Sequence, residues 1–218
     1  MVSRLLFRAS RSALAGPIVR FGFTYLSPLI PVRRLVTTRE LTAFHHPRPS
    51  WDTHVLLVPR VGISNILDVR PARVGVIAGI LRQARRIGRE VYDGTGPMSL
   101  MVNGGRYQDV GQLHFHLIRG AGVAPLVSIP DAPRSAEAVA GMPHPDPQRE
   151  FHHLFRLAMP EGVVREDFIP SDAQIRSLLD QVDAAVTRHE LRPRGFTLVA
   201  RANGSNLDYS TFHLISGS

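Results

Sequence analysis

The chain has 218 residues, 44% of them hydrophobic, which suffices for one large globular domain or two small ones. It contains no cysteine, so disulfides, thiol catalysis and cysteine-ligated zinc are excluded. The formal net charge is +8, but seven of the arginines lie in residues 1–39, which hold no acid, so the rest of the chain is nearly neutral. A basic leader on a near-neutral body disfavours a nucleic-acid-binding surface.

Residues 1–34 form this basic leader, which is expected to be separate from the globular part. Several of its arginines fall on one face of an expected helix. The apolar stretch that follows, residues 18–30, contains Arg20 and Pro28, which disfavours a transmembrane span. Three interpretations stay open: a membrane-surface anchor, an organellar transit peptide, or a helix docked on the globular part. We expect a cytoplasmic protein, peripheral at a membrane if residues 1–30 are an anchor.

The globular part should begin with strands at residues 35–47 and 52–59, followed by a helix that opens at Pro71. The apolar positions of this helix include Val74, Ile77, Leu81 and Val91. Its polar positions carry arginines, which are expected to form a solvated surface. These arginines are Arg73, Arg82, Arg85, Arg86 and Arg89.

A β-hairpin is expected next, over residues 99–120. An apolar run leads into Asn103-Gly104-Gly105, residues that tolerate the backbone angles of a turn. Residues 112–118 then alternate between polar and apolar, and the side chains of a strand alternate between its two faces. The apolar face belongs to the core. The opposite face carries Gln112, His114 and His116.

Three interpretations of this histidine face compete. The first makes His114 and His116 ordinary polar residues on the solvent side of a strand. The second is a metal site, because neutral imidazole is a common metal ligand, and it requires a third ligand from elsewhere in the chain. The third is phosphate chemistry, in which one imidazole attacks phosphorus and its neighbour stabilises the charge.

The surrounding residues favour the third interpretation. The run Gln-Leu-His-Phe-His-Leu-Ile at 112–118, preceded by Asn103 and by Gln108-Asp109-Val110, resembles the signature of the histidine-triad (HIT) superfamily. Upstream, residues 41–59 resemble the other half of the family pattern: a ligand-facing hairpin followed by Thr-His, an apolar strand and a proline. The resemblance covers roughly residues 40–120.

The resemblance implies an α+β fold with a mostly antiparallel sheet and packed helices. It also implies that His114 attacks phosphorus while His116, Gln112 and His54 contact the phosphate oxygens. The residues expected to bind the remainder of the substrate are Asn103, Gly104, Gly105, Phe44, His46 and Asp109. No metal and no cofactor is required.

Two positions depart from the family pattern. Gln112 replaces the first histidine of the triad. His46 stands where many members carry an aspartate that hydrogen-bonds the ribose hydroxyls. The second departure leaves the selectivity for nucleosides open.

Residues 121–150 are rich in proline and are expected to be a linker. After it, the chain repeats the order of the first segment: a strand at 155–159, a helix opened by the capping-box residues Ser171 and Gln174, and a second Phe-His-Leu-Ile run at 212–215. Self-similarity of this kind indicates a duplicated unit.

The two Phe-His-Leu-Ile runs can be aligned. The alignment places Tyr209, Thr211 and His213 at the positions of Gln112, His114 and His116. The second segment therefore lacks the nucleophile. We interpret residues 151–218 as a degenerate HIT-like repeat packed against the catalytic unit at residues 35–120.

The function implied by the resemblance is that of a nucleotide hydrolase or nucleotidyltransferase. Such an enzyme acts at the α-phosphorus of a nucleoside phosphate ester, anhydride or phosphoramidate through a nucleotidyl-histidine. Two alternatives stay open: a nucleotide-binding module without turnover, and a metalloprotein ligated by His114, His116 and His54. The expected partners are the nucleotide or phosphoramidate substrate, a membrane surface contacted by the leader, and a second copy of the chain in a homodimer. Nucleic acid is not expected.

Overall fold

The computed structural model describes residues 34–92, 98–120, 149–165, 167–203 and 206–217. The strands are β1 (Arg34–Thr37), β2 (Leu41–His45), β3 (Thr53–Pro59), β4 (Met98–Gly104), β5 (Phe115–Arg119), β6 (Arg149–Arg156), β7 (Phe196–Asn203) and β8 (Asn206–Gly217). The helices are α3 (Val74–Glu90), α5 (Asp172–Arg188) and α6 (Leu191–Arg194), with 3-10 turns η2 (Ile66–Asp68), η3 (Pro71–Arg73) and η4 (Gly105–Tyr107).

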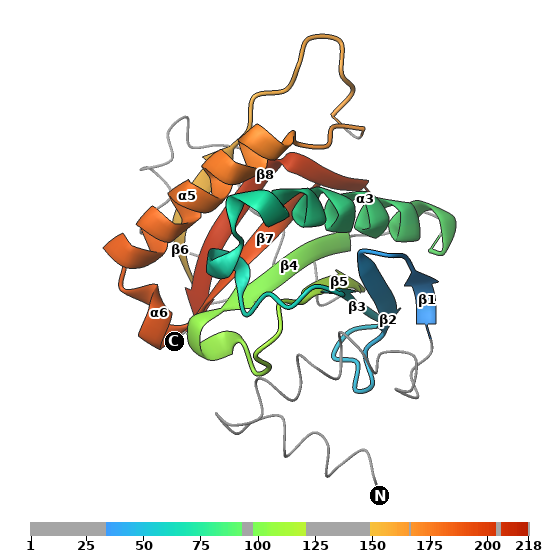
Figure 1. The fold of residues 1–218 in the computed structure, drawn as a ribbon, viewed down its shortest axis with the longest axis horizontal. Helices are drawn as coiled ribbons and strands as arrows, with labels where there is room; N and C mark the ends of the chain where they lie inside the picture. Colours follow the sequence, from blue (N-terminus) through green and yellow to red (C-terminus); the bar gives the residue numbers. More distant parts are fainter. Residues whose placement is uncertain (1–33, 93–97, 121–148, 166, 204–205, 218) are drawn as a thin grey trace, which may run out of the picture.

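The described strands form one eight-stranded sheet in the order β1-β2-β3-β5-β4-β7-β8-β6 (Figure 1). Every neighbouring pair in it is antiparallel. The two long helices, α3 and α5, contact each other and lie over the same face of the sheet. The α+β fold with an antiparallel sheet and packed helices is thus confirmed.

The sheet has a symmetric plan about its central pair, β4 and β7. Outward from that pair the order is β4, β5, β3 on one side and β7, β8, β6 on the other. Met101 pairs with Val199 at the centre, and the adjoining pairs are Leu100 with Ala200 and Val102 with Leu198. α3 and α5 have the same length, 17 residues. Each half therefore places one helix and three strands in the same order around the centre.

The core lies between the sheet and the helices. Alternate residues of each strand, such as Val55, Leu57 and Leu117, are fully buried in one cluster with the apolar stripe of α3. The residues between them point to the other face, where Phe44 and Leu56 belong to a separate small cluster. This period-two alternation decides which side chains reach the histidine face.

Local sequence signals set both ends of the long helices. The expected capping box opens α5: the Ser171 hydroxyl accepts from the Gln174 backbone N–H, and the Gln174 side chain accepts from the Ser171 backbone N–H. Pro71 begins the 3-10 turn η3, and α3 continues from Val74. The predicted helix is therefore confirmed, with a 3-10 first turn.

Two details of the sequence interpretation of α3 were wrong. Val91 follows the helix as its C-cap and is 47% exposed, so it does not belong to the apolar stripe. Arg85 is buried, whereas the other four arginines are exposed as expected. Its Nη2 donates to the carbonyls of Phe168 (2.7 Å) and Leu207 (3.2 Å), and its guanidinium lies 4.7 Å from the ring centroid of Tyr209. An arginine can be buried here because backbone carbonyls of the second half accept hydrogen bonds from its guanidinium.

The second half also differs from expectation at its start. The strand expected at 155–159 overlaps β6 only at residues 155 and 156: β6 begins at Arg149, because it pairs along β8 as far as Gly217, and it ends at Arg156. The leader expected at 1–34 and the linker expected at 121–150 lie outside the described residues except at their ends. Within the described part of the chain, no helix is long and apolar enough to cross a membrane.

Candidate active site

Strands β3 and β5 bring His54 and His116 together. His116 is opposite Leu56 and His54 is opposite Ile118, so the two histidines are diagonal neighbours on the sheet face away from the helices. Their rings touch: His54 Nε2 and His116 Nδ1 are 2.8 Å apart. Both side chains are buried.

A chain of hydrogen bonds sets the tautomers of these two rings. The backbone N–H of Ser50 donates to His54 Nδ1 over 3.4 Å, so the proton of a neutral His54 is on Nε2. His54 Nε2–H then donates to His116 Nδ1, which leaves the His116 proton on Nε2. That Nε2 is buried and has no hydrogen-bond partner within the described residues. A buried donor without a partner is costly, and it is suited to an anion that enters the site.

His114 has the opposite arrangement. Its Nδ1 lies 2.8 Å from the carbonyl oxygen of Gln112, and a carbonyl accepts only, so Nδ1 carries the proton and Nε2 carries the lone pair. The ring centroids of His114 and His116 are 4.9 Å apart. His114 is partly exposed, whereas His116 is buried. The partly exposed His114 thus has a lone pair on Nε2 beside the His116 imidazole, which presents Nε2–H.

The rings of His46, His54, His116 and His114 form a continuous series of contacts, which we call the histidine row, and Trp51 lies beside it. The His46 ring stacks on the His54 ring, with centroids 4.1 Å apart and planes 3° from parallel, while Trp51 meets His54 edge-on at 4.9 Å. His46 Nδ1 accepts from the Arg48 backbone N–H. Trp51 was not singled out from the sequence, although its place in the loop between two strands, three residues before His54, was visible there.

Burial keeps the whole row uncharged near neutral pH. Loss of hydration lowers the pKa of His54 to about 3, with His46 and His114 adding to the effect. The same cause lowers the pKa of His46 and His114 from its ordinary value, and it lowers the pKa of His116 further. The hydrogen bond to the Gln112 carbonyl and the charge of Asp109 act against this shift, because each raises the pKa of His114.

The expectation that the Gln112 side chain shares the histidine face was wrong. β5 begins only at Phe115, so strand alternation does not extend back to Gln112. The side chain is buried, and its Nε2 donates to the carbonyls of Pro59 and Val61 at 3.2 Å. The residue acts on the site through its backbone carbonyl, which holds His114.

The residues expected to bind the rest of the substrate fall into two groups. Phe44 is buried against Leu56, the residue opposite His116, and so lies beside the histidine row. Gly104 and Gly105 instead pack on the second half of the chain. A Cβ at Gly104 would meet the Phe196 ring, and one at Gly105 would meet the Arg192 carbonyl. Close packing therefore explains both glycines, and their small size gives no support to a phosphate cradle.

A metal centre is not favoured by these positions. Among the described residues, no group of three or more His, Asp or Glu side chains is arranged to hold a metal ion. His54 and His116 direct their nitrogens at each other rather than at a common point.

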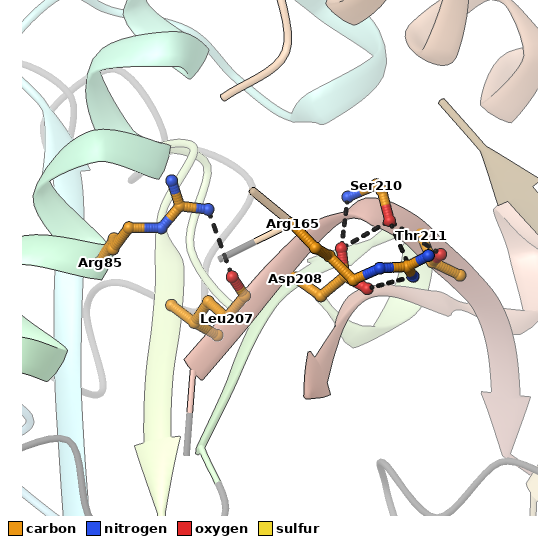
Figure 2. Close-up of polar contacts among 6 residues, drawn as sticks. All are labelled: Arg85, Arg165, Leu207, Asp208, Ser210 and Thr211. Atoms are coloured by element: carbon orange, nitrogen blue, oxygen red, sulfur yellow. Dashed lines mark hydrogen bonds and ion pairs between the residues drawn. The ribbon is translucent and has the colours of Figure 1, made fainter. Parts of the chain in front are cut away.

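Strand β8 in the second half of the chain carries a separate polar group, shown in Figure 2. Asp208 accepts from the hydroxyl of Ser210 at 2.6 Å and from Arg165 at 3.1 Å. Thr211, the residue aligned with His114, contacts the Ser210 hydroxyl at 3.4 Å. Tyr209 points into the core and donates to the Leu81 carbonyl of α3. The side chains of Arg165, Asp208, Ser210 and Thr211 therefore bond to one another.

The sequence model of the HIT domain matches residues 28–122. These residues are a HIT domain. The match contains the whole histidine row and ends before β6.

Curated relatives and solved structures of HIT proteins are similar to this chain over a comparable length. An uncharacterized HIT-like protein of Buchnera aphidicola is 24% identical over 94 residues, covering 42% of this chain and 84% of that protein. An uncharacterized HIT-like protein of Azospirillum brasilense is 26% identical over 102 residues, covering 45% and 84%. A HIT family hydrolase of Legionella pneumophila is 26% identical with a TM-score of 0.40, covering 45% and 89% of the two chains.

Proposed function

We propose that this protein is a nucleotide hydrolase or nucleotidyltransferase that acts at the α-phosphorus of a nucleoside phosphate ester, anhydride or phosphoramidate. The observation that carries the proposal is the paired arrangement of His114 and His116. One ring has its Nδ1–H held by the Gln112 carbonyl and a free Nε2 lone pair, and its neighbour has a buried Nε2 donor without a partner. A nucleophile beside a donor is what an in-line attack on a phosphate requires.

The proposed reaction has two displacements. His114 Nε2 attacks phosphorus, the N–P bond forms, and the bond to the leaving group breaks with its electron pair going to that group. The imidazole now carries positive charge, which the Gln112 carbonyl stabilises through Nδ1–H. Water or another hydroxyl acceptor then attacks phosphorus and releases one proton to the solvent, the N–P bond breaks, and the nitrogen recovers its lone pair. His116 Nε2–H would donate to a non-bridging oxygen in both steps.

The uncharged state of the histidines supports this proposal. A nucleophilic imidazole must be neutral, and burial keeps the pKa of His114 below its ordinary value. A nucleotide-binding module without turnover would need no imidazole oriented in this way. The His46 departure is compatible with either function, because it concerns the nucleoside and not phosphorus.

We also propose that residues 149–218 are a degenerate second copy of the HIT unit. The support is the symmetric strand order about β4 and β7, together with equal helix lengths. In the sheet register, Phe115 is opposite Leu57 in the first half and Phe212 is opposite Phe155 in the second. With Thr211 at the His114 position, one chain would carry one active site.

The nucleophile assignment is tested by trapping. The full-length protein is mixed with a panel of nucleoside phosphoramidates and phosphoanhydrides, quenched, and analysed by intact and peptide mass. We expect one nucleotidyl group per chain, on His114, and none in His114→Ala. His189→Ala, which changes a histidine outside the row, is the matched control and should label normally. Full labelling or turnover in His114→Ala would refute the assignment.

A further inference from the structure

The side chain of Asn103 bridges the two halves of the chain at the edge of the histidine row. Asn103 in β4 is directly opposite Thr197 in β7. The Thr197 hydroxyl donates to Asn103 Oδ1 over 2.8 Å. Thr197 is buried, being 4% exposed, so its hydroxyl has little access to water as an alternative partner.

The sheet register places this pair next to the proposed nucleophile. Met101 is opposite His116 on one side and Val199 on the other, so these three residues share a face. Asn103 and Thr197 are each two residues along the same strands and therefore lie on that face too. Val102 is opposite Phe115 in the β4–β5 register, so Asn103 and His114 directly adjoin the two residues of this pair.

The direction of the hydrogen bond matters for an anionic ligand. A carboxamide has one acceptor oxygen and one donor nitrogen, and rotation by half a turn exchanges them. Because the Thr197 hydroxyl occupies Oδ1, the Nδ2–H groups of Asn103 remain as donors. Nδ2–H attracts a phosphate oxygen, whereas Oδ1 in the same place would repel it.

The turn that follows Asn103 is fixed by the same half of the chain. Gly104 packs on the Phe196 ring and Gly105 on the Arg192 carbonyl. In return, the ring of Tyr107 lies where a Cβ on Gly195 would be. The backbone around Asn103 is thus held in place by residues 192–197.

We propose that Thr197 is a positioning residue of the His114 site, which orients the Asn103 amide so that Nδ2–H donates to the phosphate of the substrate. The second half, which lacks the catalytic histidines, would then contribute to the chemistry of the first half through one hydroxyl. This proposal rests on the proposed function, because the ligand of Asn103 is the phosphate that His114 attacks.

The test compares Thr197→Val, which keeps the shape and removes the hydroxyl, with Thr197→Ser, which keeps the hydroxyl. Two quantities are measured on the full chain: the rate of nucleotidyl-histidine formation, and the affinity for a panel of nucleoside 5′-monophosphates by calorimetry. We expect Thr197→Val to lower both by about threefold to tenfold, the range for one hydrogen bond, and Thr197→Ser to restore both toward wild type.

Thr211→Val is the matched control, since it makes the same change at a buried threonine of β8 that contacts Ser210 and not Asn103. It should leave both quantities unchanged. In Asn103→Ala, addition of Thr197→Val should cause no further loss, because a hydroxyl that acts through Asn103 has nothing left to orient.

The possible failures are distinguishable. Normal labelling and affinity in Thr197→Val, or losses that multiply with those of Asn103→Ala, would overturn the role of Thr197 and leave the nucleophile standing. If wild type binds monophosphates but forms no adduct, the proposed catalysis fails while the affinities still decide the role of Thr197. If wild type neither binds nor reacts, both proposals are refuted.

Discussion

At the residue scale, two backbone groups determine what each imidazole can do. The Ser50 N–H makes His54 a donor to His116, and the Gln112 carbonyl makes His114 a nucleophile through its other nitrogen. Neither backbone group is recognisable by residue type, since any amino acid supplies an N–H or a carbonyl at most positions. The chemistry of the row therefore depends on the path of the backbone as much as on the histidines.

The histidine row predicts how stability depends on pH. The pKa of His54 is about 3 in the folded protein and 6.5 for an unperturbed histidine, so between these values the unfolded chain binds a proton that the folded chain refuses. Stability should fall as the pH falls from about 6.5 toward 3. Urea midpoints measured from pH 7.5 to pH 5 will check this, and His54→Gln should have a shallower slope. Greater stability at pH 5 than at pH 7.5 would contradict the assignment.

His46 predicts a change in nucleoside selectivity. Its Nδ1 accepts from the Arg48 N–H, so the neutral ring offers Nε2–H, a donor, where an aspartate would offer acceptors. Ribose hydroxyls donate more readily to a carboxylate, so His46→Asp should favour ribonucleotides over 2′-deoxyribonucleotides by several-fold relative to wild type. The ratio of the two affinities is the measurement.

His46→Asn is the control for this change, because it also removes the stacked ring but adds no charge. An equal change in ratio for His46→Asn would show that the lost stacking on His54, and not the carboxylate, is responsible.

The sequence could place a residue on a strand face only where its neighbours along the chain or the family pattern defined that place. His116 is inside a strand, so alternation gave its face, whereas His54, the second residue of β3, was placed by the family resemblance. The predicted face of the Gln112 side chain was wrong because the alternating pattern in the sequence extends beyond the start of the strand. The Leu113 N–H donates to the Ile63 carbonyl and not to a neighbouring strand of the sheet. Thr197 was not predicted as a site residue, because it is 94 positions from Asn103 and only the sheet register joins them.

At the element scale, the 3-10 turn η4, which directly follows β4, packs against the second half of the chain. Gly105 has φ = 58°, in the left-handed region, and a Cβ there would also meet the Arg192 carbonyl. Gly162 has φ = 77° with nothing within 4 Å of the position of a Cβ. A side chain at Gly162 would therefore meet backbone strain alone, whereas one at Gly105 would meet backbone strain and a steric clash.

Alanine at these two glycines should therefore have unequal effects. Gly162→Ala should cost about 1–2 kcal/mol of unfolding free energy from strain alone. Gly105→Ala should cost more, and it should also slow labelling of His114, because the turn carries Asn103. Denaturant unfolding and the trapping assay give the two readouts. Equal losses of stability in both variants, with normal labelling in Gly105→Ala, would show that the contact with Arg192 is easily relieved.

The secondary structure followed the local signals of the sequence where these were strong. Pro71 and the Ser171–Gln174 capping box marked the helix starts to within a few residues. β6 was placed too late because its first residues follow a proline-rich stretch, and only pairing with the last residues of β8 makes them a strand. Arg85 was predicted to be solvent-exposed because helix periodicity places it among other arginines. The carbonyls that accept its hydrogen bonds belong to Phe168 and Leu207, which are distant in the sequence.

At the scale of the whole molecule, the second half covers surfaces that the first half cannot cover alone. β7 pairs with β4 along residues 100–104, which would otherwise be an open sheet edge. α5 packs against α3, and the Tyr209 hydroxyl and Arg85 guanidinium bond across the same boundary. Apolar residues of both halves form one buried cluster at this boundary. The side chains of Arg85, Tyr209, Ser99 and Thr197 hydrogen-bond across it and lose these partners if the halves separate.

Removal of residues 149–218 should for this reason cause association and not a simple loss of half the activity. The shortened chain would expose the β4 edge and the inner side of α3, and two copies can pair through their β4 edges or aggregate. Light scattering after size exclusion should find dimers or larger species, with His114 labelling weakened by the loss of Thr197. A homodimer of the full chain would have to form elsewhere, since β7 already occupies the β4 edge. A stable, fully active monomer of the shortened chain would show that the second half neither protects nor completes the first.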